Sequence, residues 1–304
     1  MIVVLSGGVG AARLLRVLRR MAPDEEIVAV VNVGDDLVLH GLTICPDLDT
    51  IAYTLAGLSN EETGWGRRDE SWRVMEELTS LGGASWFGLG DRDLATHLYR
   101  SQRLAEGATK TVVTAELVER WGVPVRLLPV SDDPVRTRFS TAIGPLSFQE
   151  YFVRHHHDVT VSAVDVEGAD LAHPTPDVVR ALHEARRVVI APSNPVISIG
   201  PLLAVRGVHE LVAARRADVV AVSPLIGGRA LKGPADRLLR ELGFGGGHAA
   251  VAGAYEGLLG RLVIDESDAA EAPALRAQGL DVTVCPTLMG DPDRDARLAA
   301  AVLE

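Results

Sequence analysis

The chain opens with MIVVLSGGVGAAR (residues 1–13), in which a short apolar run stops at a pair of glycines. The run over 2–6 predicts a first strand, and near-continuous valine and isoleucine over 27–33 is typical of a second, parallel strand that is covered on both faces. Apolar residues then recur at helical spacing over 11–21, so a helix should follow the glycines. This strand–turn–helix start predicts an α/β fold with the glycine turn at the carboxyl end of the first strand.

The glycine turn alone leaves its role open. Gly7, Gly8 and Gly10 let the backbone approach a diphosphate, and the following helix presents its positive N-terminus. The turn lacks the third glycine of the dinucleotide fingerprint, and no Lys-Ser or Lys-Thr pair completes a phosphate-binding loop of the NTPase kind. A tight turn that only permits close packing explains the same residues, so both interpretations stand at this point.

Strand-like and helix-like patterns alternate over most of the remaining chain. Buried strands are predicted at 27–33, 125–130, 187–195, 217–225, 261–265 and 281–286, and helices at 49–58, 71–81, 93–104 and 114–121, the last with Thr114 as N-cap. This alternation predicts a Rossmann-like, doubly wound, mostly parallel sheet in one α/β domain spanning 1–304. Polar–apolar alternation around Gly144 and Pro145 predicts an inserted, smaller antiparallel and helical subdomain at roughly 135–165, and His40-Gly41 suggests a hairpin.

Composition excludes several classes of protein. The 304 residues are 47% hydrophobic, which is enough for a large core. The net charge of −11, without a run of Lys or Arg, makes nucleic acid an unexpected partner. Two distant cysteines, Cys45 and Cys285, build neither a disulfide framework nor a CxxC zinc site. No apolar run reaches the roughly 18 residues of a membrane span, and the first strand lacks a basic signal-peptide start, so we expect a cytoplasmic protein without membrane association.

Two acidic turns follow in the first part of the chain. NVGDD (32–36) and CPDLDT (45–50) bring four carboxylates into one short stretch, those of Asp35, Asp36, Asp47 and Asp49. Clustered carboxylates repel one another unless a cation or hydrogen-bond donor joins them, and magnesium prefers such oxygen ligands together with substrate phosphates. Capping of the next helix by Asp47 or Asp49 is the structural alternative.

WFGLGDRD (86–93) also combines glycines with charge at a helix start. Asp91 or Asp93 can cap that helix. Arg92 opposes the helix dipole there, so its position indicates a carboxylate or ligand partner. Trp65 and Trp86 lie near glycine-rich loops and are the tryptophans best placed to stack on an aromatic ligand.

Later strand ends carry polar loops. In APSNPVISIGPLL (191–203), two prolines stiffen a loop that offers Ser193 and Asn194 to a ligand. In VSPLIGGRALKGPAD (222–236), Lys232 suits a phosphate or a base carbonyl, although a solvated lysine is the commoner role.

GFGGGH (243–248) is interpreted as a plain loop. The three consecutive histidines at 155–157 would point to alternating faces of a strand, which disfavours a shared metal. No Ser-His-Asp arrangement or reactive cysteine is evident.

In this order, SGGVGAAR, NVGDD, CPDLDT, WFGLGDRDLATH, FQEYFV, APSNPVISIGPLLAV, VSPLIGGRALKGPAD and TLMGD closely resemble the 2-phospho-L-lactate transferase family of coenzyme F-420 biosynthesis, whose bacterial members are phosphoenolpyruvate transferases. The resemblance implies that Fo, a deazaflavin analogue of riboflavin, attacks the distal phosphorus of a guanosine diphosphate that carries enolpyruvate or lactate. GMP leaves, and dehydro F-420-0 or F-420-0 forms. Magnesium, a Rossmann-like fold and a homodimer are also implied.

The resemblance further implies roles for individual residues. Asp49 and Arg92 would contact Fo and act in catalysis, with Trp86 and Gly90 beside Fo and Asp49 a candidate proton acceptor. Asp35 and Asp49 are the choice for magnesium. The remaining assignments are to the nucleotide and its phosphates: Gly7, Gly8, Gly10, Ser193, Asn194, Ser198, Ser223, Gly228, Lys232 and Gly233.

Two rival functions remain from the sequence. A related gluconeogenesis-factor family shares the glycine-rich start and a Val-Asp-Asp element, and would make the chain a nucleotide-sugar-binding regulator; the 86–93 and 191–203 stretches favour the transferase. A nicotinamide-dependent oxidoreductase is disfavoured by the missing third glycine. The acid carried by the donor, whether enolpyruvate, lactate or glycerate, stays open.

Overall fold

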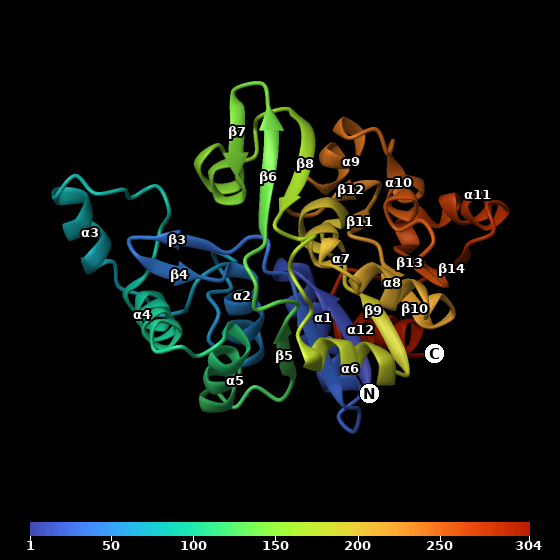
Figure 1. The fold of residues 1–304 in the computed structure, drawn as a ribbon. Helices are drawn as coiled ribbons and strands as arrows, with labels where there is room; N and C mark the ends of the chain where they lie inside the picture. Colours follow the sequence, from blue (N-terminus) through green and yellow to red (C-terminus); the bar gives the residue numbers. More distant parts are fainter.

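The computed structural model describes all residues, Met1–Glu304, and its centre is a seven-stranded sheet (Figure 1). All of its strands are parallel, in the order β14-β13-β10-β9-β1-β2-β5. These strands are β1 (Ile2–Ser6), β2 (Ile27–Val31), β5 (Arg126–Pro129), β9 (Arg187–Ile190), β10 (Val219–Val222), β13 (Arg261–Ile264) and β14 (Asp281–Val284). The predicted doubly wound parallel sheet is therefore confirmed.

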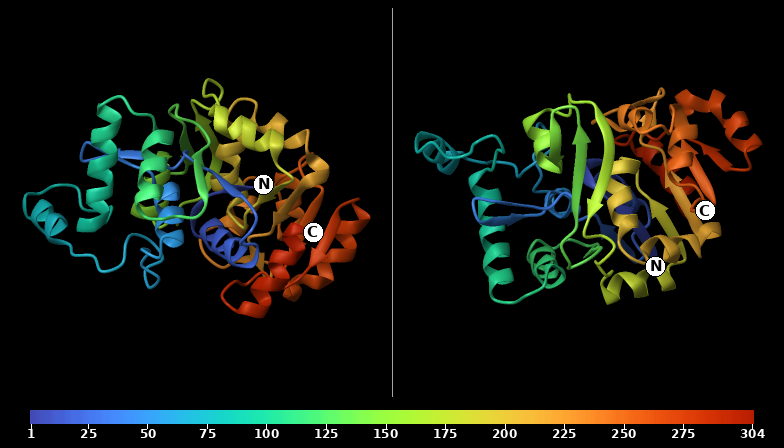
Figure 2. Two further views of the ribbon diagram at one scale, coloured as in Figure 1. Left: turned by 90° about the horizontal axis from the view of Figure 1, so that it is seen from below. Right: turned by 45° about the horizontal axis from the view of Figure 1, so that its top comes forward.

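Helices cover both faces of this sheet (Figure 2). Because successive residues of a strand point to opposite sides, Val3 and Leu5 enter one core and Ile2 and Val4 enter the other. The second core is closed by α1 (Gly8–Met21), α2 (Pro46–Leu55) and α12 (Pro292–Leu303). The first is closed by α6 (Pro176–Glu184), η2 (Pro195–Ile199), α7 (Gly200–Ala204), α8 (Val208–Ala213), α9 (Ala235–Glu241), α10 (Gly247–Ala254) and α11 (Ala272–Ala277).

The predicted antiparallel segment is also confirmed. β6 (Arg136–Thr141) pairs with both β7 (Gly144–Ser147) and β8 (Val161–Glu167), and the short η1 (Glu150–Arg154) lies between the latter two. Figure 1 shows this sheet standing above the ends of the parallel strands. Its aromatic residues Phe139, Phe148 and Tyr151 share a small core with Ile197 and Leu238, which anchors it to η2 and α9.

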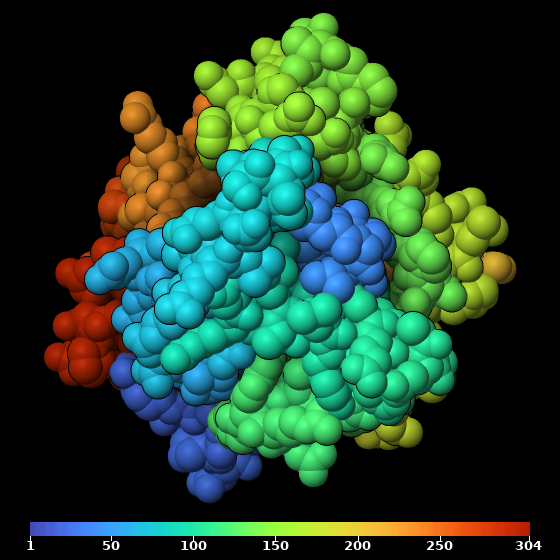
Figure 3. Space-filling model, turned by 90° about the vertical axis from the view of Figure 1, so that its left-hand side faces the viewer, coloured from blue at the N-terminus to red at the C-terminus, as the bar shows by residue number.

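A hairpin and three helices extend from the other edge of the sheet. β3 (Leu37–Leu39) and β4 (Leu42–Ile44) form the predicted hairpin, with both His40 and Gly41 at positive φ. The helices are α3 (Arg73–Ser80), α4 (Asp91–Ala105) and α5 (Lys110–Arg120). Figure 3 shows the part that includes α3, in cyan, spread across this face beside the inserted sheet.

Three local predictions were wrong. α5 begins one turn earlier than expected, because Thr109 and not Thr114 accepts the capping bond, from the amide of Val112. The histidines at 155–157 lie in a turn after η1 rather than in a strand, and His156 and His157 have positive φ. The glycine-rich stretch 243–248 runs into α10, so it is a helix start as well as a loop.

The remaining elements complete the C-terminal part. β11 (Leu225–Ile226) and β12 (Arg229–Ala230) form a small hairpin, η3 (Arg216–Asp218) precedes β10, and η4 (Glu266–Glu271) precedes α11. None of the helices combines the length and the apolar character that crossing a bilayer requires.

One glycine of the opening turn has a testable packing role. A methyl group on Gly10 would lie 2.1 Å from the carbonyl oxygen of Pro192, so Gly10→Ala must push α1 away from the loop after β9. We expect a loss of about 2–4 kcal/mol in the free energy of unfolding, measured by urea denaturation. In Gly253→Ala, on α10, the new methyl group meets nothing within 4 Å, and this control should gain up to about 1 kcal/mol. Equal stabilities of the two variants would contradict the packing account.

Candidate active site

The strand order creates a crevice beside the opening strand. β1 lies between β2 and β9, so the chain leaves β1 toward one edge of the sheet and later returns on its other side. Ligands of open α/β sheets bind at such a reversal, beyond the carboxyl ends of the strands. A cavity of about 790 Å³ lies there, toward the upper end of the about 300–1,000 Å³ typical of ligand sites.

The glycine turn forms the floor of this cavity. Gly7 is the N-cap of α1 and offers no side chain, so the amides of the first helical turn are left for other partners. A methyl group on Gly7 would lie 2.7 Å from Cβ of Ser198, and Gly8 has a φ of 66°. Close packing explains Gly7 and the left-handed backbone explains Gly8, and this arrangement brings amides at the start of α1 to the cavity.

The four clustered aspartates divide into two kinds. Asp36 forms an ion pair with Lys110, with Nζ 2.5 Å from Oδ2, and does not line the cavity. Asp49 lines the cavity, but both its oxygens accept hydrogen bonds from the buried guanidinium of Arg100. These two carboxylates already have cationic partners from the protein.

Asp35 and Asp47 have no such partner. One amide nitrogen, Nδ2 of Asn32, lies 3.0 Å from Oδ1 of Asp35 and 3.0 Å from Oδ2 of Asp47, so the two carboxyl groups are held side by side. Burial, followed by the neighbouring charge of Asp47, raises the pKa of Asp35 well above its ordinary range. Burial raises the pKa of Asp47 to about 7, although hydrogen bonds from Asn32 and the Gly8 amide act in the opposite direction.

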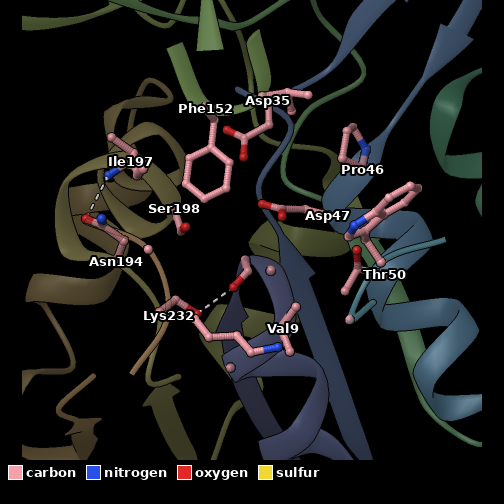
Figure 4. Close-up of a pocket in the computed structure, with 18 of the residues that line it drawn as sticks. Val9, Asp35, Pro46, Asp47, Thr50, Phe152, Asn194, Ile197, Ser198 and Lys232 are labelled. Carbon is pink, nitrogen blue, oxygen red and sulfur yellow. Dashed lines mark hydrogen bonds between the residues drawn. The ribbon is translucent and has the colours of Figure 1, made fainter. Parts of the chain in front are cut away.

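This pair fits a divalent cation better than the predicted pair of Asp35 and Asp49. Figure 4 shows the carboxyl groups of Asp35 and Asp47 pointing into the cavity, with Phe152 and Ser198 across from them. Burial raises the pKa of both groups, and a cation bound between them would compensate their negative charge in this buried position. The role of Asp49 as a metal ligand stays a prediction, and its bonds to Arg100 do not favour it.

An aromatic and acidic group lies at the α2 and α4 end of the cavity. Asp93 accepts a hydrogen bond from the hydroxyl of Tyr53 at 2.7 Å and lies 3.3 Å from Nε2 of His97. Burial alone would raise the pKa of Asp93, but His97 and Tyr53 leave it below its ordinary value. Trp65 and Trp86 line the same end, and Trp65 is 50% exposed.

Arg92 and Gly90 do not line the cavity. The side chain of Arg92 is 53% exposed and lies 3.7 Å from Asp69, which supplies the carboxylate partner that its position indicated. Gly90 is the N-cap of α4, and a methyl group there would collide with Glu70. Their assignments to Fo stay predictions.

Acidic residues cap both α3 and α4, and each helix receives its cap from a residue near the start of the other helix. Glu70 accepts the amides of Arg92 and Asp93 at the start of α4, at 2.7 and 2.9 Å. Asp91 instead accepts the amides of Arg73 and Val74, at the start of α3. The predicted capping of α4 by Asp91 or Asp93 is therefore wrong, because Asp91 caps the preceding helix and Asp93 faces the cavity.

Loops after β9 and β10 form the opposite end of the cavity. Ser193 donates to the carbonyl of Gly7 at 2.6 Å, which ties the β9 loop to the glycine turn. Asn194 caps η2 through its carbonyl oxygen, and its buried Nδ2 has no protein partner. The cavity lining on this side also includes Ser198, Ser223 and Gly233, whereas Gly228 lies outside the cavity. Lys232 lines the cavity as well, but its Nζ extends to Gly64, where a methyl group would lie 2.9 Å from it.

A Ser-His-Asp arrangement is present, contrary to the sequence analysis. Nδ1 of His248 lies 2.8 Å from the hydroxyl of Ser223, and its Nε2 lies 3.2 Å from Oδ2 of Asp268. Ser223 follows β10, His248 lies in the first turn of α10, and Asp268 lies in η4. Only a strand end before Ser223 and a helix start at His248 could have signalled it, because these residues are far apart in the sequence.

Comparisons with known proteins agree with the motifs. The family model described as 2-phospho-L-lactate transferase CofD matches residues 2–283. A protein of Streptomyces griseus subsp. griseus named phosphoenolpyruvate transferase is 45% identical over 309 residues, which cover 100% of this chain and 97% of the relative. A protein of the same name from Mycolicibacterium smegmatis is 41% identical over 324 residues, covering 100% and 98%.

A solved structure shares the fold. A member of the UPF0052 family from Bacillus halodurans matches with a TM-score of 0.68 at 17% sequence identity, covering 100% of this chain and 98% of that one. This likeness extends over the parallel sheet and the inserted segment but concerns the fold alone. With a family match over almost the whole length and long relatives above 40% identity, the chain is a transferase that belongs to the 2-phospho-L-lactate transferase CofD family.

Proposed function

We propose that the protein transfers an enolpyruvyl phosphate group from a guanosine diphosphate-linked donor to the terminal ribityl hydroxyl of Fo, releasing GMP and forming dehydro F-420-0. One observation carries the proposal. A continuous cavity joins the aromatic end at α2 and α4, the unneutralised Asp35 and Asp47 beside the α1 amides, and the polar loops after β9 and β10. The relatives named phosphoenolpyruvate transferase favour enolpyruvate over lactate as the acid.

The donor fits the part of the cavity between α1 and β10. The first-turn amides of α1 bring positive charge to this part, where a diphosphate would lie. Arg13 and Lys232 also line the cavity, and Nζ of Lys232 lies close to Gly64, beside Trp65. Such preorganised donors stabilise the charge that develops in phosphoryl transfer.

The acceptor fits the aromatic end. Trp65 and Trp86 offer ring faces to a deazaflavin, and Tyr53, Asp93 and His97 offer polar contacts. The new bond joins the ribityl oxygen of Fo to the distal phosphorus, while the bond from that phosphorus to the bridging oxygen breaks. That oxygen leaves on GMP. Asp49 is poorly placed to take the hydroxyl proton, since Arg100 occupies both its oxygens, so the proton would pass to the leaving phosphate oxygen of GMP or to water.

We further propose that magnesium is held by Asp35 and Asp47, in place of the Asp35 and Asp49 pair. A bound magnesium ion would supply charge neutralisation at the diphosphate. The protein's own part is to present both carboxylates without a competing cation and to fix them through Asn32. As the resemblance implies, we also propose a homodimer in the cytoplasm.

The reaction itself can be tested by mass spectrometry. The purified protein, Fo, magnesium and the enolpyruvyl guanosine diphosphate donor should yield dehydro F-420-0 and GMP in equal amounts. A parallel reaction with the lactyl donor should be slower, because the similar proteins are named phosphoenolpyruvate transferase. Consumption of neither donor, with tight binding of a uridine diphosphate sugar, would contradict the transferase proposal and favour the regulator.

The substitution Asp47→Asn should lower the activity of the protein but raise its stability above neutral pH. We expect kcat/KM to fall by about 10²–10³, because one of the two ligands for magnesium is lost. The folded-state pKa of Asp47, about 7, lies above its ordinary value of 3.8, so ionisation opposes folding increasingly as the pH rises between these values. Without divalent cations, the variant should therefore be more stable than the parent at about pH 8, by about 1–2 kcal/mol, and the difference should vanish near pH 4.

Urea denaturation at the two pH values gives the stability comparison. Asp36→Asn is a matched control from the same turn: its carboxylate pairs with Lys110 outside the cavity, so activity should stay within several-fold of the parent when the variant is folded. If the parent protein were more stable than Asp47→Asn at both pH values, this would contradict the conclusion that ionisation of Asp47 opposes folding.

The magnesium requirement should depend on pH. Protons compete with a cation for Asp35 and Asp47, whose pKa values are both raised by burial. The half-saturating magnesium concentration should rise at least about tenfold as the pH falls from about 8 to about 6, because the ligands must be deprotonated. Initial rates at saturating Fo and donor provide the measurement. A requirement that is constant over this range would place magnesium on other ligands.

A further inference from the structure

A buried histidine in the C-terminal part of the protein has a ring nitrogen without a partner. His248 lies in the first turn of α10 and is 0% exposed, and its Nε2 forms no hydrogen bond. Oδ2 of Asp268, in η4, nevertheless lies 3.2 Å from this nitrogen. Because this distance is short enough for a hydrogen bond, the oxygen must lie away from the direction in which a ring N–H would point.

Glu271 brings a second carboxylate to the same place. Ligand atoms of His248, Asp268 and Glu271 all lie within 4.8 Å of one another. Gly247 permits this approach, because it has a φ of 67° and a methyl group there would lie 2.9 Å from Oε2 of Glu271. The end of the glycine-rich stretch 243–248 therefore lets a carboxylate lie directly against the start of α10.

Neither carboxylate has a cation from the protein. No Lys or Arg side chain forms an ion pair with Asp268 or Glu271. Each accepts one backbone amide, that of Gly227 at 2.8 Å for Asp268 and that of His248 at 3.0 Å for Glu271. These bonds hold the carboxylates in position, as is usual for carboxylates that bind metals, and they leave further lone pairs on the oxygens.

A hydrolytic triad does not explain the arrangement. Ser223 contacts Nδ1 of His248, but a triad also needs a hydrogen bond that orients the other ring nitrogen, and Nε2 forms none. The residue after the serine is Pro224, which has no backbone N–H to stabilise an oxyanion.

We propose that His248, Asp268 and Glu271 bind a divalent transition-metal ion of the zinc class, with water in the remaining position. An imidazole nitrogen together with carboxylate oxygens suits zinc and its neighbours, whereas magnesium and calcium prefer oxygen ligands. Zinc bonds of about 2.0–2.2 Å at tetrahedral angles place two ligand atoms about 3.3–3.6 Å apart. The 3.2 Å between Nε2 and Oδ2 is close to this separation.

The contact between His248 and Ser223 agrees with this assignment. When Nε2 binds a metal, Nδ1 carries the ring proton and donates it to the hydroxyl oxygen of Ser223, 2.8 Å away. None of the three ligands lines the cavity, so this site is separate from the magnesium site proposed at Asp35 and Asp47. The ion would join η4 to α10 and stabilise the folded chain, whatever reaction the cavity supports.

Titration with Co²⁺ tests the site, because cobalt bound to nitrogen and oxygen ligands absorbs visible light. The full chain is freed of metal with a chelator and titrated in excess Mg²⁺, which occupies the proposed magnesium site. We expect one Co²⁺ per chain, displaced by an equal amount of Zn²⁺. Saturating Zn²⁺ should also raise the Tm of the metal-free protein by about 3 °C or more.

Asp268→Asn and Glu271→Gln remove one ligand charge each but keep an oxygen for the backbone amide that the carboxylate accepts. Each should weaken Co²⁺ binding at least about tenfold and reduce the Tm shift with Zn²⁺. Glu266→Gln is the matched control, since this acid lies in the same η4 but pairs with Arg297 at 3.5 Å, and it should leave both measurements unchanged.

Two results would overturn the inference. One is a parent protein that binds no Co²⁺ in excess Mg²⁺. The other is Co²⁺ binding of parental strength in both ligand variants, which would place the ion elsewhere, such as at the histidines 155–157. If Asp268→Asn does not fold, parental binding in Glu271→Gln, whose side chain is partly exposed, overturns the inference by itself.

Discussion

The juxtaposition of two buried carboxylates, Asp35 and Asp47, is the constraint on which the rest of the site depends. One amide group of Asn32 holds both, and neither has a cation from the protein. Isolated buried charges of this kind oppose folding, so the arrangement is unfavourable until a cation enters. The neighbouring carboxylates of Asp36 and Asp49 are neutralised by Lys110 and Arg100, which leaves this pair as the electrostatic centre of the cavity.

The topology of the sheet delivers this pair to the phosphate-binding turn. β1 and β2 end side by side, so Asp35 follows one strand while the first-turn amides of α1 follow the other. The amide of Gly8 reaches Asp47, and Gly10 lets α1 approach the loop after β9. Donor amides, carboxylates and the polar loop after β9 are thus brought together by backbone packing, before any ligand is considered.

Much of this could be predicted from the sequence, because the signals are local. Apolar runs ending in glycine or aspartate located the strand ends, and the motif order indicated the family. The ionic state of each aspartate could not be predicted, since Lys110 and Arg100 come from helices remote in the sequence. The capping of α4 by Glu70 and of α3 by Asp91 could not be predicted either, because the partners are distant in the sequence. The same holds for the contact between Ser223 and His248.

The most direct test of the metal assignment is anomalous diffraction from crystals grown with manganese and guanosine diphosphate. The account predicts one manganese ion bonded to carboxylate oxygens of both Asp35 and Asp47, at about 2.0–2.4 Å, beside the nucleotide phosphates at the α1 N-terminus. An ion on Asp49 instead, with Asp35 and Asp47 unbound and Arg100 displaced, would contradict it.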